Sequence, residues 1–182
     1  MPDLGTTLLT LARNAISAHF GLPQTATVDC PELHKMGATF VTLTQHDDLR
    51  GCIGSLDAWR PLAPDVQENA RAAAFRDPRF EPLTVGELPD TRVEVSLLTP
   101  AEPMSFTSEA DALTQLQPEI DGLIFTAGRH RSTFLPQVWE QLPDPAEFMA
   151  HLKQKAGLPA NYWGPDVRLE RYSVKKWKEA AP

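Results

Sequence analysis

The chain has 182 residues, of which 42% are hydrophobic and 23% charged, and its net charge is −7. This length and composition fit a folded globular protein with one core of ordinary size, or one core with a small annex, and argue against a disordered chain. The acidic balance argues against a general nucleic-acid binder, which would carry a basic face, and no apolar run approaches the ~20 residues needed to cross a bilayer.

The first predicted element is an amphipathic helix in which apolar residues recur at helical spacing from Leu4 to His19. Asp3 is placed to cap its start, and Gly21 and Pro23 end it. After a loop, residues 38–45 are rich in β-branched side chains and predict a strand. The polar turn at 46–48 then predicts a hairpin with a second strand over residues 49–56.

The remaining elements alternate between helix and strand. We predict a helix over 61–76, a strand over 91–99, a short helix opened by Ser108, a strand pair over 121–135, a helix over 145–156 capped by Asp144, and a final strand over 167–175. Two of the strand pairs have connections too short for parallel crossovers. The pattern therefore predicts an α+β fold with a largely antiparallel sheet flanked by helices, and a single domain over residues 1–182.

The two cysteines, Cys30 and Cys52, are too few for a disulfide framework in a chain of this length. The N-terminus lacks the features of a signal peptide, because Asp3 stands where a basic region is expected. These features predict a cytoplasmic protein with free thiols.

The most informative segment is Leu49-Arg-Gly-Cys-Ile-Gly54. Side chains alternate along a strand, so Arg50, Cys52 and Gly54 are expected to share one face. A guanidinium beside a thiol favours the thiolate, which attacks electrophiles, and Gly51 and Gly54 are expected to leave room for a substrate. Arg50 and Cys52 are therefore candidate catalytic residues, and the two glycines are candidate substrate contacts. The alternative is that Cys52 fills space as a small buried hydrophobe.

Other residues admit a functional and a structural interpretation. Arg129 and Arg131 stand in a polar hairpin, where they are candidate anion contacts or simply exposed charges. His46 is a candidate base for Cys52 or a solvated turn residue. Asp77 is expected to pair with an arginine or cap a turn. Phosphate-binding, dinucleotide, hydrolase-elbow and zinc motifs are missing, so the sequence identifies neither a metal site nor a cofactor.

Several blocks together resemble the AMMECR-type domain family, whose prokaryotic members are called AmmeMemoRadiSam system protein A. The blocks are LRGCIGSL (49–56), ENARAAAFRDPRFEPLT (68–84), VEVSLLTP (93–100), DGLIF (121–125), FLPQVWEQLPDPAEFMAHLKQKAGLP (134–159) and RYSV (171–174). The resemblance implies an AMMECR-like fold with a larger and a smaller lobe, with LRGCIG as the hallmark of a suspected site. Ser132 stands where many relatives have glycine.

The resemblance implies two partners, a Memo-like protein and a radical S-adenosylmethionine enzyme, but no reaction. The chain lacks the CxxxCxxC motif, so it is not itself the radical enzyme. Two hypotheses remain open. The chain is an enzyme component that uses Cys52 on a small anionic substrate, or it is a non-catalytic adaptor for the two partners. Nucleic-acid binding is disfavoured because the sequence has no basic stripe.

Overall fold

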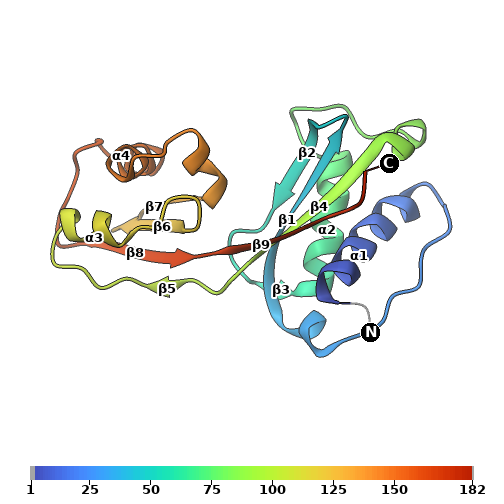
Figure 1. Ribbon diagram of the computed structural model, residues 1–182, viewed down its shortest axis with the longest axis horizontal. Coiled ribbons are helices and arrows are strands. Elements are labelled where there is room, and N and C mark those ends of the chain that lie inside the picture. Colours follow the sequence, from blue (N-terminus) through green and yellow to red (C-terminus); the bar gives the residue numbers. More distant parts are fainter. Residues whose placement is uncertain (1–2, 182) are drawn as a thin grey trace. The chain divides into compact units, whose positions relative to one another are not determined.

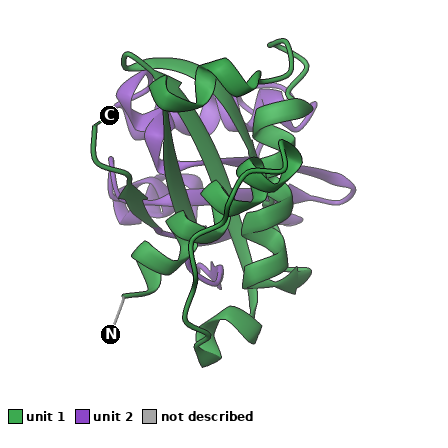
Figure 2. Cartoon of the chain, turned by 90° about the vertical axis from the view of Figure 1, so that its right-hand side faces the viewer, with its two compact units in different colours: residues 1–98, 175–182 green, residues 99–174 purple. Residues whose placement is uncertain are grey.

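Two separate β-sheets organise the chain in the computed structural model, which describes residues 3–181. Each sheet belongs to one of two compact units, shown in different colours in Figure 2. Unit 1 comprises Met1–Leu98 and Lys175–Pro182, and unit 2 comprises Thr99–Val174. The single domain predicted over the whole chain stays a prediction.

Unit 1 is built on a five-stranded sheet with the strand order β2-β1-β4-β9, with β3 also paired to β1. Figure 1 shows two long helices on one face of this sheet. The elements are α1 (Leu4–His19), η1 (Pro31–His34), β1 (Met36–Gln45), β2 (Asp48–Gly54), β3 (Arg60–Pro61), α2 (Leu62–Phe75), η2 (Val85–Asp90), β4 (Thr91–Leu98) and β9 (Val174–Lys178).

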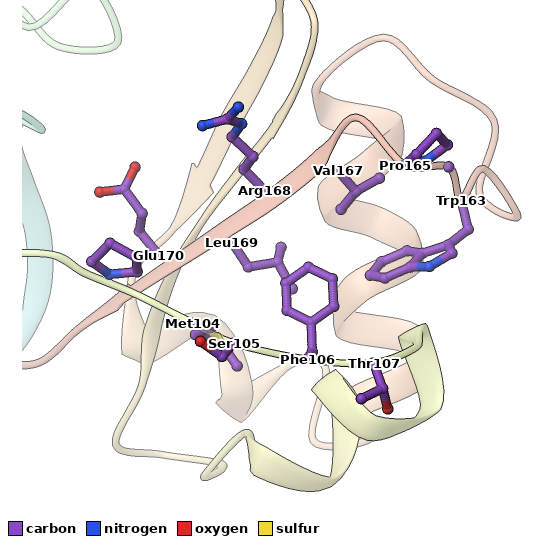
Figure 3. A pocket seen from close by; sticks show the side chains of 12 residues that line it. Met104, Ser105, Phe106, Thr107, Trp163, Pro165, Val167, Arg168, Leu169 and Glu170 are labelled. Atoms are coloured by element: carbon purple, nitrogen blue, oxygen red, sulfur yellow. The ribbon is translucent and has the colours of Figure 1, made fainter.

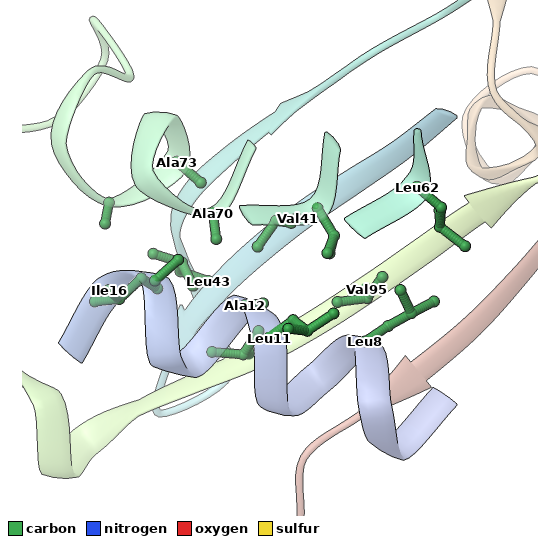
Figure 4. Packing of buried hydrophobic residues seen from close by; sticks show 14 of the residues in the cluster. Leu8, Leu11, Ala12, Ile16, Val41, Leu43, Leu62, Ala70, Ala73 and Val95 are labelled. Carbon is green, nitrogen blue, oxygen red and sulfur yellow. The ribbon is translucent and has the colours of Figure 1, made fainter. Parts of the chain in front are cut away.

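The core of unit 1 lies between the two helices and the sheet (Figure 4). Leu8 and Ile16 of α1 and Val66 of α2 are fully buried, as are Val41 and Val95 of the sheet. Burying each of these side chains contributes about 1.5–3 kcal/mol to the hydrophobic term. The apolar spacing that predicted both helices is therefore the spacing of the residues that hold them on the sheet.

Unit 2 contains a four-stranded sheet with the order β5-β8-β6-β7. Its core includes Trp139 and Phe148, whose rings stack with centroids 3.8 Å apart, and the buried Phe125 and Leu152. The elements are β5 (Glu102–Pro103), α3 (Glu109–Gln115), β6 (Gly122–Ala127), β7 (His130–Phe134), η3 (Pro136–Glu140), α4 (Pro145–Lys155) and β8 (Val167–Tyr172).

The main strand pairs, β1–β2, β1–β4, β6–β7 and β6–β8, are all antiparallel. The predicted α+β class is thus confirmed, with helices flanking antiparallel sheets in a larger and a smaller unit. The predicted caps are also present, because Asp3 accepts a hydrogen bond from the N–H of Thr6 and Asp144 from that of Glu147. Within residues 3–181, no helix has the length and apolar character required to cross a membrane.

The end of the chain differs from the prediction. The segment predicted as one strand over 167–175 is two strands, β8 in one sheet and β9 in the other. They part at Ser173, whose N–H donates to the hydroxyl of Thr99 at 2.8 Å and whose carbonyl accepts from the N–H of Thr99 at 2.8 Å. In unit 1, β9 is held by Trp177, which fills the space that a Cβ would occupy at Gly5 of α1.

Candidate functional site

Cys52 lies in β2, directly opposite Thr42 of β1. Its Sγ is 3.3 Å from the Thr42 hydroxyl oxygen, and the residue is partly buried with a free thiol. The preceding residue, Gly51, faces the backbone of α2. Because side chains alternate along a strand, Cys52 projects from the opposite face of the sheet. The thiol is therefore outside the helix-covered core.

The backbone of Cys52 is held by the side chains of Asp77 and Arg79, which follow α2. The Cys52 N–H donates to Asp77 Oδ2 at 3.0 Å, and Arg79 Nη2 donates to the Cys52 carbonyl at 3.4 Å. β2 is the edge strand of its sheet, so the two side chains bind groups that another strand would otherwise bind. We call Asp77 and Arg79 the edge clamp.

The two clamp residues also bind each other. Arg79 donates to Asp77 from Nη2 at 2.7 Å and from Nε at 3.0 Å, and the Asp77 side chain is only 2% exposed. The hydrogen bonds from Arg79 hold the pKa of Asp77 far below its ordinary value, and the N–H of Cys52 adds to this effect. The pKa of Arg79 is raised, chiefly by its hydrogen bonds to Asp77. The prediction that Asp77 pairs with an arginine is confirmed.

Arg50 does not have the environment that the sequence predicted. Gly51 pairs with Leu43 and Leu49 with Thr44, so a bulge leaves Arg50 as the extra residue and breaks the expected alternation. Its guanidinium donates to Glu87, at 3.0 Å from Nε and 3.3 Å from Nη2, and to the carbonyl of Glu81.

This engagement of Arg50 has a clear electrostatic consequence. Arg50, followed by the N–H of Thr84, lowers the pKa of Glu87 from 4.5 to about 2. Nε and Nη2 of Arg50 thus bind the η2 segment of unit 1, whereas its Nη1 is buried without a hydrogen-bond partner among the described residues. The structure thus pairs Arg50 with Glu87 and Glu81, and the arginine that donates to the Cys52 backbone is Arg79.

The two glycines of the motif are required by packing. A Cβ on Gly51 would lie 2.2 Å from the carbonyl oxygen of Ala73 in α2, and a Cβ on Gly54 would lie 2.2 Å from the ring of Phe40. Both spaces that the sequence suggested for a substrate are thus filled by the protein itself. Gly51 lets α2 approach β2, and Gly54 lets the Phe40 ring lie across the strand.

A buried polar cluster beside the motif was not predicted. Asp65, fully buried in α2, accepts hydrogen bonds from the N–H and hydroxyl of Thr39, the hydroxyl of Ser55 and Nε of Arg60. Asn69, one turn later, donates to the carbonyl of Thr39 and the hydroxyl of Ser55. The available signal was the four-residue spacing of Asp65 and Asn69, which places both on the sheet-facing side of the helix.

The other predicted contacts, Arg129 and Arg131, are exposed residues of the β6–β7 hairpin in unit 2, whereas Cys52 belongs to unit 1. The geometry within either unit therefore does not join them to the thiol. Ser132 of β7 is buried, and its hydroxyl donates to the carbonyl of Leu152 at 2.7 Å. It therefore anchors β7 to α4.

His46 is not a partner of Cys52. It lies in the exposed hairpin turn with φ of 52°, beyond the pair Gln45–Asp48. Cys52 pairs with Thr42, four residues before His46 in the sequence. Of the two interpretations of His46, the structure supports the solvated turn residue. No group of three or more His, Cys, Asp or Glu side chains suited to a metal ion occurs among the residues that the structure describes.

Comparison with known proteins identifies the family to which the chain belongs. The family model described as AMMECR1 matches residues 9–177. The chain belongs to the AMMECR1 family. A protein of Methanothermobacter thermautotrophicus is 38% identical over 97% of this chain and 95% of its own length. Protein MJ0810 of Methanocaldococcus jannaschii is 35% identical over 98% of this chain and 91% of its own length.

The fold is shared with a solved structure. The crystal structure of the uncharacterized protein PH0010 from Pyrococcus horikoshii matches with a TM-score of 0.82 and 32% sequence identity, covering 98% of this chain and 92% of that one. The match spans both units of the present chain. The AMMECR1 family and its α+β architecture are thereby established for this protein.

Proposed function

We propose that this AMMECR1-family protein is an enzyme component in which the Cys52 thiol acts on a small anionic substrate. The observation that carries the proposal is the contact between Cys52 and the edge clamp. Asp77 and Arg79 fix the backbone of Cys52 through its N–H and its carbonyl, while the sulfur stays on the face of the sheet away from α2. A partly buried cysteine whose backbone is fixed by a guanidinium supports a thiol used in nucleophilic chemistry.

Arg79 takes the role that the sequence assigned to Arg50. Its side chain is 55% exposed although it is bound to Asp77, so its remaining N–H groups are accessible to a ligand. A guanidinium binds carboxylates and phosphates through paired hydrogen bonds, which supports an anionic substrate. In this proposal Arg79 attracts the anion and Thr42, 3.3 Å from Sγ, orients the thiol.

The proposed partners follow from the family resemblance alone. A Memo-like protein and a radical S-adenosylmethionine enzyme would act with this chain, either by supplying its substrate or by consuming its product. We place this activity in the cytoplasm, a location supported by two cysteines that are both free thiols.

Alkylation with two reagents of different charge tests the site. Iodoacetate is anionic and iodoacetamide is neutral, and both alkylate thiols. We expect the rate with iodoacetate divided by the rate with iodoacetamide to be about fivefold higher at Cys52 than at Cys30. Arg79→Gln is expected to remove this preference for the anionic reagent. Arg76→Gln is the matched control, because Arg76 is also a surface arginine, 57% exposed, after the same helix. Equal ratios at both cysteines would contradict the proposal.

A second candidate function is a non-catalytic adaptor for the same partners, and the packing of the glycines favours it. The Cβ positions of Gly51 and Gly54 are occupied by α2 and Phe40, as expected if the motif serves the fold. Reconstitution with the two partners distinguishes the hypotheses. The enzyme proposal predicts that Cys52→Ser abolishes product formation while partner capture persists, and the adaptor predicts that product formation survives.

A further inference from the structure

A pocket of about 1020 Å³ lies in unit 2 beside β8 (Figure 3). One wall is the segment 103–107, which begins at the last residue of β5, and the other is the segment 163–170, which contains most of β8. The walls are joined where the N–H of Met104 donates to the carbonyl of Leu169 at 2.8 Å. The volume is close to the upper limit of small-molecule sites, which run from about 300 to 1,000 Å³.

One side of the pocket is apolar and aromatic. The rings of Phe106 and Trp163 have centroids 5.5 Å apart and are tilted by 57°. Figure 3 shows Val167 and Leu169 projecting toward these rings from β8. Val167 and Leu169 also belong to the core of unit 2, so this wall is fixed by packing. Such a surface favours a flat apolar group, because aromatic rings interact through offset or edge contacts.

The Trp163 ring is supported from within the unit. Lys153 of α4 places its Nζ 5.5 Å from the centre of the ring, in cation–π contact. The Lys153 side chain is 1% exposed and donates to Glu109 of α3 at 2.6 Å. The aromatic wall is thus held in place before any ligand arrives, which lowers the cost of binding.

The opposite side of β8 carries charge. Arg168 and Glu170 alternate with Val167 and Leu169 and project from the other side of the strand in Figure 3. Arg168 is exposed, and among residues 3–181 no carboxylate forms an ion pair with it. Arg168 is also the cationic side chain among the residues that line the pocket, and it lies next to Val167 at the Trp163 end. A ligand that reaches both faces of β8 therefore meets the rings of Phe106 and Trp163 on one face and the guanidinium of Arg168 on the other.

We propose that this pocket binds a small ligand that combines a planar aromatic ring with a carboxylate or another anionic group. The ring packs against Phe106 and Trp163, and the anion pairs with Arg168. Glu170, two residues from Arg168, selects against a ligand with a second anionic group at the Met104 end. The site is formed entirely by unit 2 and goes beyond the function proposed for Cys52, which belongs to unit 1.

Three indoles of different charge test the proposal on the full chain. Indole-3-acetate, indole and tryptamine share a ring and carry a negative, neutral and positive charge. Binding is followed through the indole N–H signal of Trp163 in nitrogen-15 correlation spectra, assigned with Trp163→Phe. Trp59, which is 63% exposed in unit 1, supplies the control signal for nonspecific stacking. We expect indole-3-acetate to bind about fivefold more tightly than indole, and tryptamine more weakly than both.

The variants separate the two parts of the site. Arg168→Gln is expected to equalise the three affinities, whereas Arg92→Gln, an arginine of unit 1, is expected to leave the order unchanged. A Trp163 signal that stays fixed up to about 10 mM of each indole overturns the proposal, since a pocket of this kind should reach millimolar affinity. Equal movement of the Trp59 and Trp163 signals overturns it as well. A Cys52→Ser variant is expected to bind like the natural chain, so failure here leaves the thiol proposal untouched.

Discussion

The carboxylate of Asp77 accepts a hydrogen bond from the backbone N–H of Cys52 at 3.0 Å. The two residues come from different elements, since Cys52 lies in β2 and Asp77 follows α2. The bond ties the end of the helix to the free edge of the sheet at the position of the thiol. The edge clamp thus has two consequences, because it closes an edge strand against other chains and places a guanidinium on the backbone carbonyl of Cys52.

We expect Asp77→Ala to lower the free energy of unfolding by about 3 kcal/mol, because a buried carboxylate that binds a guanidinium and two backbone N–H groups is lost. The measurement is urea unfolding. Glu68→Ala is the control, since Glu68 also pairs with arginines but its side chain is 38% exposed, and we expect it to cost less than about 1 kcal/mol. Equal costs for the two variants would show that the clamp does not stabilise the sheet edge.

Glu87 predicts a loss of stability in acid. Arg50 and Thr84 lower the pKa of Glu87 from 4.5 to about 2 in the folded chain. Below pH 4.5 the unfolded chain takes up a proton that the folded chain resists, so stability falls as the pH falls from 4.5 to about 2. The stability contributed by ionised Glu87 is fully present above pH 4.5.

The test is to follow the free energy of unfolding across the same window in the natural chain and in Glu87→Gln. The variant cannot take up this proton, so its stability should fall less steeply with decreasing pH. Glu119→Gln, an exposed glutamate for which the structure shows no ion pair within residues 3–181, should retain the slope of the natural chain. Parallel curves for Glu87→Gln and the natural chain would exclude this carboxylate as a source of the acid sensitivity.

Much of the fold could be predicted because its signals are local. Helix periodicity, the caps Asp3 and Asp144, and the β-branched run in β1 each depend on neighbouring residues in the sequence. The division of residues 167–178 into β8 and β9 could not be predicted from the sequence, because it depends on which sheet each half joins. That choice is set by distant contacts such as Ser173 with Thr99.

The candidate site shows the same limit more sharply. Alternation placed Arg50 beside Cys52, but one extra residue in β2 redirected Arg50 to Glu87. A glycine inside a strand often marks a bulge, but it does not identify which neighbouring residue is the extra one. Arg79, the arginine that does contact Cys52, lies two residues after Asp77, for which the sequence predicted an arginine partner or a turn cap but no contact with Cys52.

Gly51 provides a direct test of the packing explanation. A Cβ there would lie 2.2 Å from a backbone oxygen of α2, which cannot move without shifting the helix. We expect Gly51→Ala to lower the free energy of unfolding by about 2–3 kcal/mol through overpacking. Gly86→Ala is the control, because no atom lies within 4 Å of its Cβ position. If Gly51→Ala is as stable as Gly86→Ala, the glycine is not required by the contact with α2.

The ion pair between Lys153 and Glu109 predicts an asymmetric response to mutation. The Lys153 side chain is 1% exposed, whereas that of Glu109 is 33% exposed, so removing Glu109 strands a buried charge and removing Lys153 leaves a carboxylate that reaches water. We expect Glu109→Ala to cost about 3 kcal/mol in urea unfolding and Lys153→Met less than about 1 kcal/mol.

The double variant completes the cycle for this pair. Once Lys153 is replaced by methionine, no buried ammonium is left unpaired, so Glu109→Ala/Lys153→Met should be more stable than Glu109→Ala alone. The physical reason is that an apolar side chain of similar length fills the same space in the core without a desolvated charge. The reverse order of costs, or a double variant less stable than Glu109→Ala, would mean that the Lys153 ammonium finds water or another acceptor when Glu109 is removed.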